Sequence, residues 1–498
     1  MNTYELISIG LYLIIMILIG IYSYMKSSSN SEDFLIGGRK MGPIVTALSA
    51  GASDMSGWLL MGVPGAMYLS GISSSWIAIG LTTGAFINYV LIAPRLRVYT
   101  EVAKNSITLP VFFENRFHDK TNLLKVVSSL MILIFFTLYT SAGMVSGGRL
   151  FESAFAMDYT TGLIVTSFVV VAYTFLGGFL AVSLTDFIQA TIMIIALIVV
   201  PTVILMEIGG INKAIDIIEN KGDFYFDLTK GTSTIGIISL LAWGLGYFGQ
   251  PHILVRFMAI ENVHDMTKAR RVGITWMIFT VGGALLVGLF GIAYIQTYVP
   301  SKISFFDGSK ENAETIFIYL SRYLFHPLIG GFLLSAILAA VMSTISSQLL
   351  VTSSSLTEDI YKAFINKKAS TKNQLIASRL SVLIVALVAF VLSLDPKDSI
   401  LNLVGNAWAG FASAFGPLII LSLLWKRTTS IAALTGMIVG GATVLLWVYI
   451  PHPFKELYEI IPGFLFSFAS IIFVSLITQK PSKEIEEEFN IVEKMLKK

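Results

Sequence analysis

Long runs of apolar residues, separated by short polar segments, recur along almost the whole chain. A helix needs about 20 apolar residues to cross the hydrocarbon core of a bilayer. Thirteen segments have roughly this length and character, and we predict a membrane-spanning helix in each of them. They are residues 4–25, 43–69, 73–94, 124–148, 160–180, 186–206, 233–255, 272–298, 327–352, 376–394, 399–425, 430–450 and 457–478. The pattern therefore predicts an all-α polytopic membrane protein.

The composition supports this prediction. Of the 498 residues 55% are hydrophobic and only 13% are charged, whereas a soluble domain carries about 25% charged residues. The chain has no cysteine, which excludes disulfides and cysteine-based metal sites. Its five histidines are scattered along the sequence, so a histidine metal cluster is not expected. A net charge of +3 is too small to indicate nucleic-acid binding.

The basic residues predict the orientation in the membrane. Thirteen spans place the two termini on opposite sides. If the N-terminus lies outside, 25 of the 34 Lys and Arg residues fall in the inner segments. Because inner loops are enriched in basic residues, we expect a cell-membrane protein with its C-terminus in the cytoplasm. One transmembrane domain would cover residues 1–480, and 481–498 would form a short tail containing an amphipathic surface helix.

The second predicted span contains residues that disfavour a continuous helix. Residues 47–57 are mostly Ala, Ser and Gly, which allow close helix packing, but they include Asp54. A carboxylate near the centre of a span costs about 2.5–3.5 kcal/mol and normally faces a cavity, an ion or a partner. Because Gly51, Gly57 and Pro64 flank it, the helix can unwind there. Unwound backbone offers carbonyls to a cation and N–H groups to an anion.

The seventh span repeats this pattern, because residues 241–251 hold three glycines and a proline. Trp243 and Tyr247 are separated by four residues, so they share a face if the segment is helical. Such a pair suits a ligand with an apolar body, although aromatic core packing is an alternative. The two breaks lie five spans apart, which predicts inverted five-helix repeats over residues 43–206 and 233–425. Interrupted helices at corresponding positions point to the binding site of a transporter.

Hydroxyl groups follow one face of the ninth span. Ala336, Ala340, Ser343 and Ser347 have helical spacing, and Ser343 lies ~14 Å from the inner end of its span. Asp54 lies at a similar depth in its own span, ~16 Å from the inner end. Hydroxyl stripes often only join helices, but sodium prefers hard oxygen ligands, as Ca²⁺ and Mg²⁺ do. The matching depth therefore favours a sodium site.

Three blocks of this sequence resemble the sodium/solute symporter family. They are residues 51–62, 243–252 and 338–348, and the likeness extends from about residue 5 to 480. Within the family the chain closely resembles bacterial sodium/proline symporters, including the osmoregulated branch. The resemblance implies thirteen helices, a five-plus-five inverted-repeat core of the leucine-transporter type, and alternating access coupled to Na⁺. It implies no enzyme activity and no cofactor apart from Na⁺ as the coupling ion.

The resemblance also implies the site residues. Asp54 matches an acidic residue that is essential for sodium coupling in the family. The sodium ligands correspond to the carbonyls of Ala52, Met55 and Ala340 and the hydroxyls of Ser343 and Thr344. The positions that match the proline site or its lid are Ser56, Gly57, Trp58, Tyr139, Trp243, Tyr247, Gln250 and Pro251.

Four functions compete at this stage. They are sodium-driven L-proline uptake, transport of another solute (an amino acid, a sugar or pantothenate), a channel, and a membrane sensor. The tail is too short for a signalling domain, no pore-lining charge rings are visible, and the aromatic pocket candidates argue against a sugar. No phosphate-binding loop or Ser/His/Asp constellation supports ATP hydrolysis or catalysis. The expected partners are L-proline, Na⁺ and the lipid bilayer, without an obligate protein partner; the role of Asp186 stays open.

Overall fold

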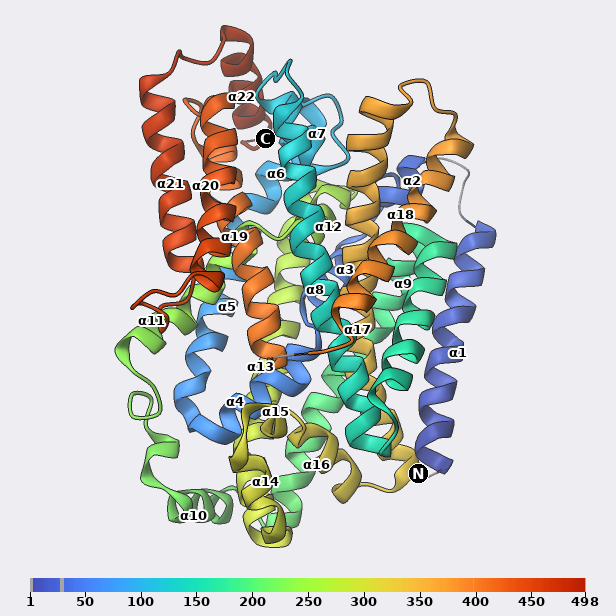
Figure 1. Ribbon diagram of the computed structural model, residues 1–498, viewed down its shortest axis with the longest axis vertical. Coiled ribbons are helices and arrows are strands. Elements are labelled where there is room, and N and C mark those ends of the chain that lie inside the picture. Colours follow the sequence, from blue (N-terminus) through green and yellow to red (C-terminus); the bar gives the residue numbers. More distant parts are fainter. Residues whose placement is uncertain (1–2, 27–30, 397, 498) are drawn as a thin grey trace.

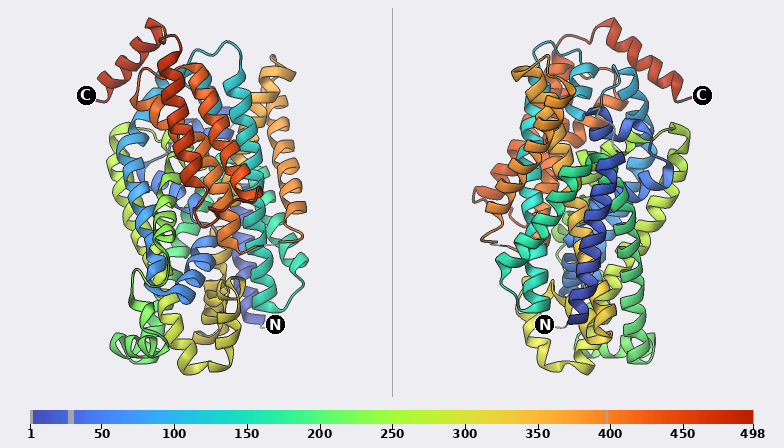
Figure 2. Two further views of the ribbon diagram at one scale, coloured as in Figure 1. Left: turned by 60° about the vertical axis from the view of Figure 1, so that its left-hand side comes forward. Right: turned by 90° about the vertical axis from the view of Figure 1, so that its right-hand side faces the viewer.

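The computed structural model describes residues 3–26, 31–396 and 398–497. Most of these residues are helical, and no strand occurs among them. The helices run along the long axis of the molecule, and the two termini lie toward opposite ends (Figures 1 and 2). We call these the N-terminal end and the C-terminal end. Two lysines counted above for the orientation, Lys397 and Lys498, lie outside the described residues.

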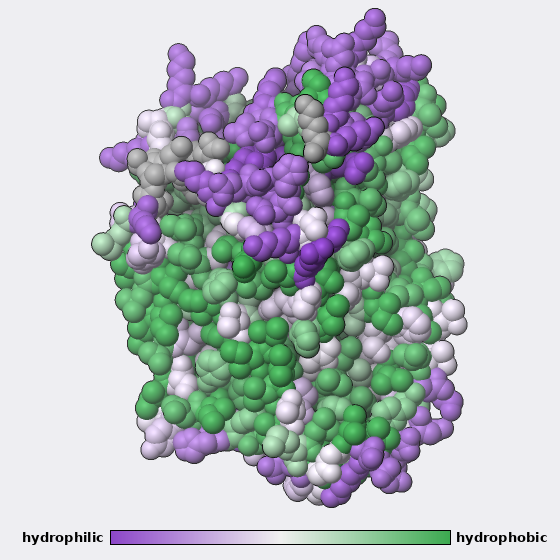
Figure 3. All heavy atoms as spheres, turned by 180° about the vertical axis from the view of Figure 1, so that it is seen from behind, coloured by the Kyte–Doolittle hydropathy of each residue, from purple (hydrophilic) through white to green (hydrophobic). Residues whose placement is uncertain are grey.

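The surface of the helical body is apolar. Figure 3 shows a broad hydrophobic zone between hydrophilic residues at the two ends, with the larger hydrophilic area at the C-terminal end. Apolar side chains facing outward in such a zone fit a lipid solvent. The distribution therefore confirms the prediction of a multi-pass membrane protein.

Most predicted spans are continuous helices. They are α1 (Thr3–Lys26), α8 (Leu123–Phe155), α13 (Met266–Tyr298), α17 (Pro327–Ser354), α18 (Thr371–Leu392), α19 (Ile400–Leu424), α20 (Ser430–Tyr449) and α21 (Ile460–Ile477). The third predicted span, 73–94, covers α5 (Trp76–Ile87) and a π-helical turn at 88–92, and the helix continues beyond its predicted end as α6 (Ala93–Val102). Shorter helices occupy the connections, namely α2 (Ser31–Ile36), α7 (Leu109–Arg116), α10 (Ile211–Lys221), α14 (Ile303–Gly308), α15 (Lys310–Ala313) and α16 (Ile316–Leu324).

The fifth and sixth predicted spans form one 50-residue element, α9 (Tyr159–Ile208). Gly178 divides it, because its φ of 55° and ψ of −144° are not helical. A Cβ atom at this position would lie 2.4 Å from the ring of Phe34. Only glycine meets both demands readily. At 1.5 Å per residue, 50 helical residues would measure ~75 Å, well over twice a hydrocarbon core of about 30 Å.

Among the described residues, ten helical segments are long and apolar enough to cross a membrane. This count is three lower than the predicted thirteen, because two pairs of neighbouring spans are each counted once and one span is too short. Residues 58–102 count as one segment, α9 counts once, and the short apolar segment 234–248 does not reach the required length. The count of thirteen stays a prediction.

The two predicted interruptions are confirmed. The second span divides into α3 (Pro43–Asp54) and α4 (Val63–Ser70), which a π-helical turn at 58–62 connects. The seventh divides into α11 (Thr234–Ala242) and α12 (Pro251–Ala259), with a 3₁₀ segment at 243–248 between them. Both breaks lie inside the bundle, where backbone N–H and C=O groups without helical hydrogen bonds must find other polar partners.

The predicted tail helix is also present as α22 (Lys483–Met495). Its buried residues are Ile485, Phe489 and Val492, which have the helical spacing that predicted it. Phe489 packs edge-on to Tyr99 of α6. The amphipathic face of α22 is therefore covered by the protein itself at the C-terminal end.

Candidate functional site

The break in the second span meets α17 at the predicted sodium site. The hydroxyl of Ser343 donates hydrogen bonds to the carbonyl of Ala52 at 2.7 Å and to that of Ala340 at 3.0 Å. Thr344 donates to the same Ala340 carbonyl at 3.1 Å. Four of the five predicted ligand residues thus form one hydrogen-bonded group, while the fifth, Met55, caps α3 directly beside it. All five residues offer carbonyl or hydroxyl oxygens, which are the hard ligands that such a cation prefers.

Asp54 is the last residue of α3, and it is 2% exposed. One carboxylate oxygen, Oδ2, accepts a hydrogen bond from the hydroxyl of Tyr247. The other oxygen, Oδ1, is buried and has no hydrogen-bond partner in the described part of the chain. The indole of Trp58 donates to the carbonyl of Asp54 at 3.1 Å. Asp54 therefore joins the two broken spans and keeps unused acceptor capacity.

Several buried polar atoms near the breaks have no hydrogen-bond partner among the described residues. They are Asp54 Oδ1, Ser56 Oγ, both amide atoms of Asn88, the Tyr139 hydroxyl, Gln250 Oε1 and both ring nitrogens of His252. An unsatisfied buried polar group costs about 1–3 kcal/mol, and most native buried groups are paired. Such a concentration in one region is typical of a site where ions, water or a polar ligand bind.

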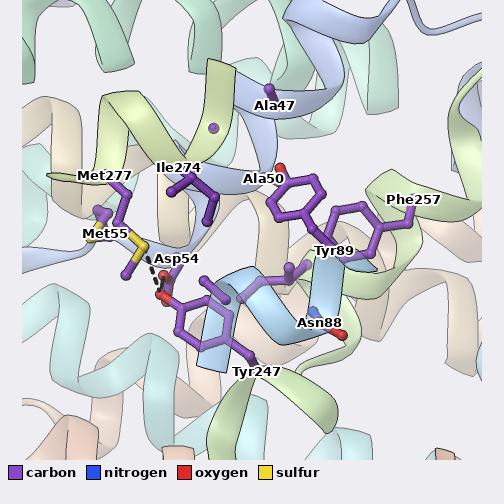
Figure 4. Close-up of a pocket in the computed structure, with 14 residues that line it drawn as sticks. Ala47, Ala50, Asp54, Met55, Asn88, Tyr89, Tyr247, Phe257, Ile274 and Met277 are labelled. Atoms are coloured by element: carbon purple, nitrogen blue, oxygen red, sulfur yellow. Dashed lines mark hydrogen bonds between the residues drawn. The ribbon is translucent and has the colours of Figure 1, made fainter. Parts of the chain in front are cut away.

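A small cavity lies beside Asp54, and Figure 4 shows its lining. Tyr247 and Met277 point toward the Asp54 carboxylate, while Tyr89 packs against Phe257 with ring centroids 4.7 Å apart. The volume is about 20 Å³, which is enough for about one water molecule. A molecule of the size of an amino acid does not fit this cavity, so the surrounding helices would have to separate before one could bind there.

An aromatic layer covers the site toward the N-terminal end. Trp243 lies at its centre, with ring centroids 6.4 Å from Trp58, 6.3 Å from Trp408 and 5.3 Å from Tyr458. The Trp408 indole donates to the carbonyl of Trp243 at 2.9 Å. Tyr458 also lines a larger cavity of about 470 Å³, which shares no lining residue with the small cavity beside Asp54.

Trp243 and Tyr247 do not share one face. The segment between them is a 3₁₀ helix, in which residues four apart are rotated by about 120° from each other. Trp243 consequently stacks in the aromatic layer, whereas Tyr247 reaches Asp54 and meets Trp408 edge-on at 5.4 Å. The expectation of a common face, which assumed an α-helix, is wrong for this reason.

The other predicted substrate residues surround the same breaks. A Cβ atom on Gly57 would lie 2.3 Å from the Ser146 hydroxyl, so glycine permits the close approach of the break to α8. Gln250 donates to the carbonyl of Trp408 at 3.1 Å, and Pro251 begins α12. Tyr139 of α8 contacts His252 edge-on, at 6.0 Å. Ser56 is fully buried within the first break.

The large cavity has a charged rim outside the predicted spans. Glu314 forms a salt bridge with Arg149 at 3.2 Å and accepts hydrogen bonds from the N–H groups of Ile400 and Leu401 at the start of α19. Burial raises the pKa of Glu314 to about 7, although those N–H groups and Arg149 lower it in part. A carboxylate at a helix N-terminus stabilises that helix, so Glu314 anchors α19 over the cavity.

Asp186, whose role the sequence left open, belongs to a buried ion pair. Its Oδ2 accepts from Ser49 at 2.6 Å and lies 3.4 Å from Nη2 of Arg256. The same Arg256 nitrogen donates to Ser347 at 2.5 Å. This cluster joins α3, α9, α12 and α17 between the sodium-site group and the C-terminal end. Removing one member would leave an uncompensated buried charge, which is strongly destabilising.

Three residues of the site are not among those predicted from the sequence, namely Asn88, Trp408 and Tyr458. Trp408 lies in Gly405-Asn-Ala-Trp-Ala-Gly410, a small-residue segment that resembles those at the two breaks and could have drawn attention to it. Tyr458 follows α20 in an ordinary loop and carries no local signal. Its hydroxyl donates to the Gly405 carbonyl at 2.8 Å, a contact between distant parts of the chain.

The fold and the geometry of the breaks define a class of protein. The structure superimposes on a solved Na⁺-coupled sialic acid symporter with a TM-score of 0.81 and 18% sequence identity, covering 97% of this chain and 99% of the other. A second neighbour is MhsT, solved in complex with L-phenylalanine, with a TM-score of 0.53, 13% identity, and coverage of 87% of this chain and 98% of that one. This is the helical fold of leucine-transporter-type secondary transporters.

The sequence specifies the family. The model of the sodium:solute symporter family matches residues 34–440, so the chain belongs to this family. The osmoregulated proline transporter OpuE of Bacillus subtilis is 56% identical over 494 residues, covering 99% of both chains. Sodium/proline symporter 2 of Staphylococcus saprophyticus is 53% identical over 500 residues, covering 99% of this chain and 96% of the relative. These relatives are transporters, and they indicate no catalytic activity.

Proposed function

We propose that this protein takes up L-proline by sodium-coupled alternating access. The observation that carries the proposal is the hydrogen bond from Ser343 of α17 to the Ala52 carbonyl at the break of the second span. This bond brings hydroxyl and carbonyl oxygens together next to Asp54, the last residue of α3. Two relatives at 53% and 56% identity carry proline transport in their names, which supports L-proline as the substrate.

Sodium would bind between α3 and α17. The ligands would be the carbonyls of Ala52, Met55 and Ala340 with the hydroxyls of Ser343 and Thr344. Because a hydroxyl that binds a cation through its lone pairs must donate its proton elsewhere, sodium binding would reorganise the present bonds of Ser343. The negative charge of Asp54 would favour the sodium-bound state. Through its hydrogen bond with Tyr247, Asp54 would also couple sodium binding to the second break.

Proline would bind between the two breaks. Its apolar ring suits Trp243, and its ammonium group suits an aromatic face or free carbonyls. Its carboxylate suits N–H groups at a helix start. The Ser56 N–H already donates to the Asp54 carbonyl at 3.0 Å, so Gly57 and Trp58 are the better candidates. Ser56, Tyr139, Tyr247, Gln250 and Pro251 would complete the pocket and its lid.

Inward movement of sodium would supply the driving force. One charge moving through 100 mV yields about 2.3 kcal/mol, which permits roughly fifty-fold accumulation before the sodium concentration gradient is counted. The basic residues favour a cytoplasmic C-terminal end, so the aromatic layer would close the external side. Residues 43–206 and 233–425 would be the two inverted repeats that rearrange during transport.

Uptake of radiolabelled proline into proteoliposomes tests the proposal. An inward sodium gradient with a negative interior should drive accumulation, and proline analogues that keep ring and carboxylate should compete. Full accumulation driven by a proton gradient in sodium-free buffer would disprove sodium coupling. Competition by glucose or pantothenate without competition by proline analogues would assign the transporter to another solute.

A further inference from the structure

An apolar groove runs along the outside of the bundle between α9 and α18, far from the breaks. The two helices lie side by side in Figure 1. The groove has a volume of about 460 Å³, and its lining includes Phe168 and Phe175 of α9 and Leu383, Leu387 and Phe390 of α18. Phe168 is 69% exposed and Leu387 is 65% exposed. In a membrane protein these side chains face lipid.

The groove continues into a basic site along the same stripe of α18. Residues 372, 379, 383, 387 and 390 follow one face of this helix, because they are separated by three, four or seven residues. A second cavity of about 530 Å³, lined by Lys372 and Arg379 among others, lies at the end where α18 begins. One helix face therefore presents two basic residues and then an apolar channel.

Arg379 connects the two cavities. Its guanidinium lies over the ring of Phe175 at 5.7 Å and over that of Tyr24 at 5.3 Å. Its Nε is buried without a hydrogen-bond partner, and no carboxylate within the described ranges forms a salt bridge with Arg379. A guanidinium held by two rings and lacking an acid is pre-arranged to bind an anion, bidentately in the case of phosphate.

The dimensions match one leaflet of a bilayer. Arg379 and Phe390 are eleven residues apart, which corresponds to ~16 Å along a helix. Half of a hydrocarbon core is about 15 Å. A chain that starts beside Arg379 and ends beside Phe390 would therefore have about the length of the acyl region of one leaflet.

We propose that the α9–α18 groove binds one anionic phospholipid of the leaflet at the C-terminal end. The phosphate would lie at Arg379 and Lys372, and one acyl chain would occupy the channel from Phe175 to Phe390. α18 packs directly on α9, and α9 also carries Asp186 of the buried ion pair. Lipid bound there would stabilise α9, which lies between the lipid-facing surface and the buried ion pair.

Lipid binding is measurable without transport. Purified protein is titrated with phosphatidylglycerol, and bound lipid is counted by native mass spectrometry, with phosphatidylcholine as the reference. Arg379→Gln should weaken phosphatidylglycerol binding about five-fold, and Arg379→Gln with Lys372→Gln about twenty-fold, since each basic residue near an anionic surface contributes about this factor. The control pair, Lys268→Gln with Arg271→Gln, removes two exposed basic residues of α13 and should retain wild-type binding.

A second variant tests the acyl channel separately. Ala172 lines the groove, so Ala172→Phe should fill it and displace the lipid, whereas Val388→Phe on the exposed flank of α18 should not. Unchanged phosphatidylglycerol binding in either Arg379→Gln with Lys372→Gln or Ala172→Phe would overturn the proposal. Equal competition by inorganic phosphate would overturn it too, because the acyl chain would then contribute nothing.

Discussion

The two breaks occupy corresponding positions in the chain, but their surroundings differ. The first break, at 55–56, faces the hydroxyl groups of α17, and its chemistry is that of carbonyl, hydroxyl and carboxylate oxygens. At the second, which comprises the 3₁₀ segment 243–248 and residues 249–250, Trp243 contacts aromatic rings of three separate segments. Tyr247 joins the two breaks through its bond to Asp54. We infer that similar backbone devices serve two tasks, ion binding at the first and substrate binding at the second.

The largest effect is expected at the contact between the breaks. Asp54→Asn keeps the shape of the side chain and removes its charge. Because removing a buried charged partner costs about 3 kcal/mol or more, sodium-stimulated proline uptake should fall by more than about a hundred-fold. Asp54→Glu should retain part of the activity. Uptake by proteoliposomes at several sodium concentrations, with equal amounts of inserted protein, measures this effect.

The matched variant for Asp54 is Tyr247→Phe, which removes the hydrogen-bond donor but keeps the charge. If the two breaks communicate through this bond, Tyr247→Phe should weaken both sodium and proline dependence moderately. Normal sodium-stimulated uptake by Asp54→Asn would mean that the carboxylate is only structural. The two breaks would then not communicate through the bond between Tyr247 and Asp54.

The next largest effect concerns the first break alone. Ser343→Ala or Thr344→Ala removes one hydroxyl ligand, and a bond to a charged group contributes about 1.5–3 kcal/mol. The apparent sodium affinity should therefore fall roughly ten- to a hundred-fold, with a smaller change in proline affinity at saturating sodium. Sodium titration of initial uptake rates provides the measurement.

Two further variants serve as controls for this effect. Ser346→Ala removes a hydroxyl that bonds within α17, to the Ser343 carbonyl at 3.0 Å, and should have little effect on sodium affinity. Thr344→Ser keeps the oxygen and should be milder than Thr344→Ala. Equal damage from both Thr344 changes would assign its role to the methyl group.

At the second break the effect should fall on proline instead. Trp243→Ala removes the centre of the aromatic layer and should raise the KM for proline about ten-fold, since one aromatic contact contributes about 0.5–1.5 kcal/mol beyond the area that it buries. Trp243→Phe should restore part of the affinity. Apparent sodium affinity should change less than KM, and the opposite pattern would contradict the division of tasks.

The smallest effect is expected at the edge of the aromatic layer. Tyr458→Phe keeps the ring on Trp243 but removes the bond to the Gly405 carbonyl, which is worth about 0.5–1.5 kcal/mol. If this bond holds the layer closed, a thiol reagent should label a cysteine placed at Ser399, in the cavity beyond it, a few-fold faster. Tyr449→Phe, at a tyrosine that is 71% exposed, is the control. Identical labelling rates would exclude Tyr458 from closure.

Local sequence was sufficient for features that depend on the backbone. Glycine, proline and the buried Asp54 predicted both breaks, because a helix cannot easily continue through such residues in lipid. Equal depth along two spans predicted the meeting of Ser343 with the Asp54 region, since helical rise is constant. Spacing alone also predicted α22. By contrast, the four-residue spacing of Trp243 and Tyr247 does not place them on one face, because a 3₁₀ turn changes the rotation per residue.

The apolar runs, the small-residue breaks and the placement of charges by themselves determined a helical membrane protein with two interrupted spans. Their physical basis is local, because the bilayer demands a certain length of apolar helix and a satisfied backbone. Only the tertiary structure decided that Tyr247 bonds to Asp54, that Arg256 pairs with Asp186, and that Tyr458 closes over Trp243. Those contacts join residues far apart in the chain, and their geometry arises from how the helices pack, which no spacing along one helix encodes.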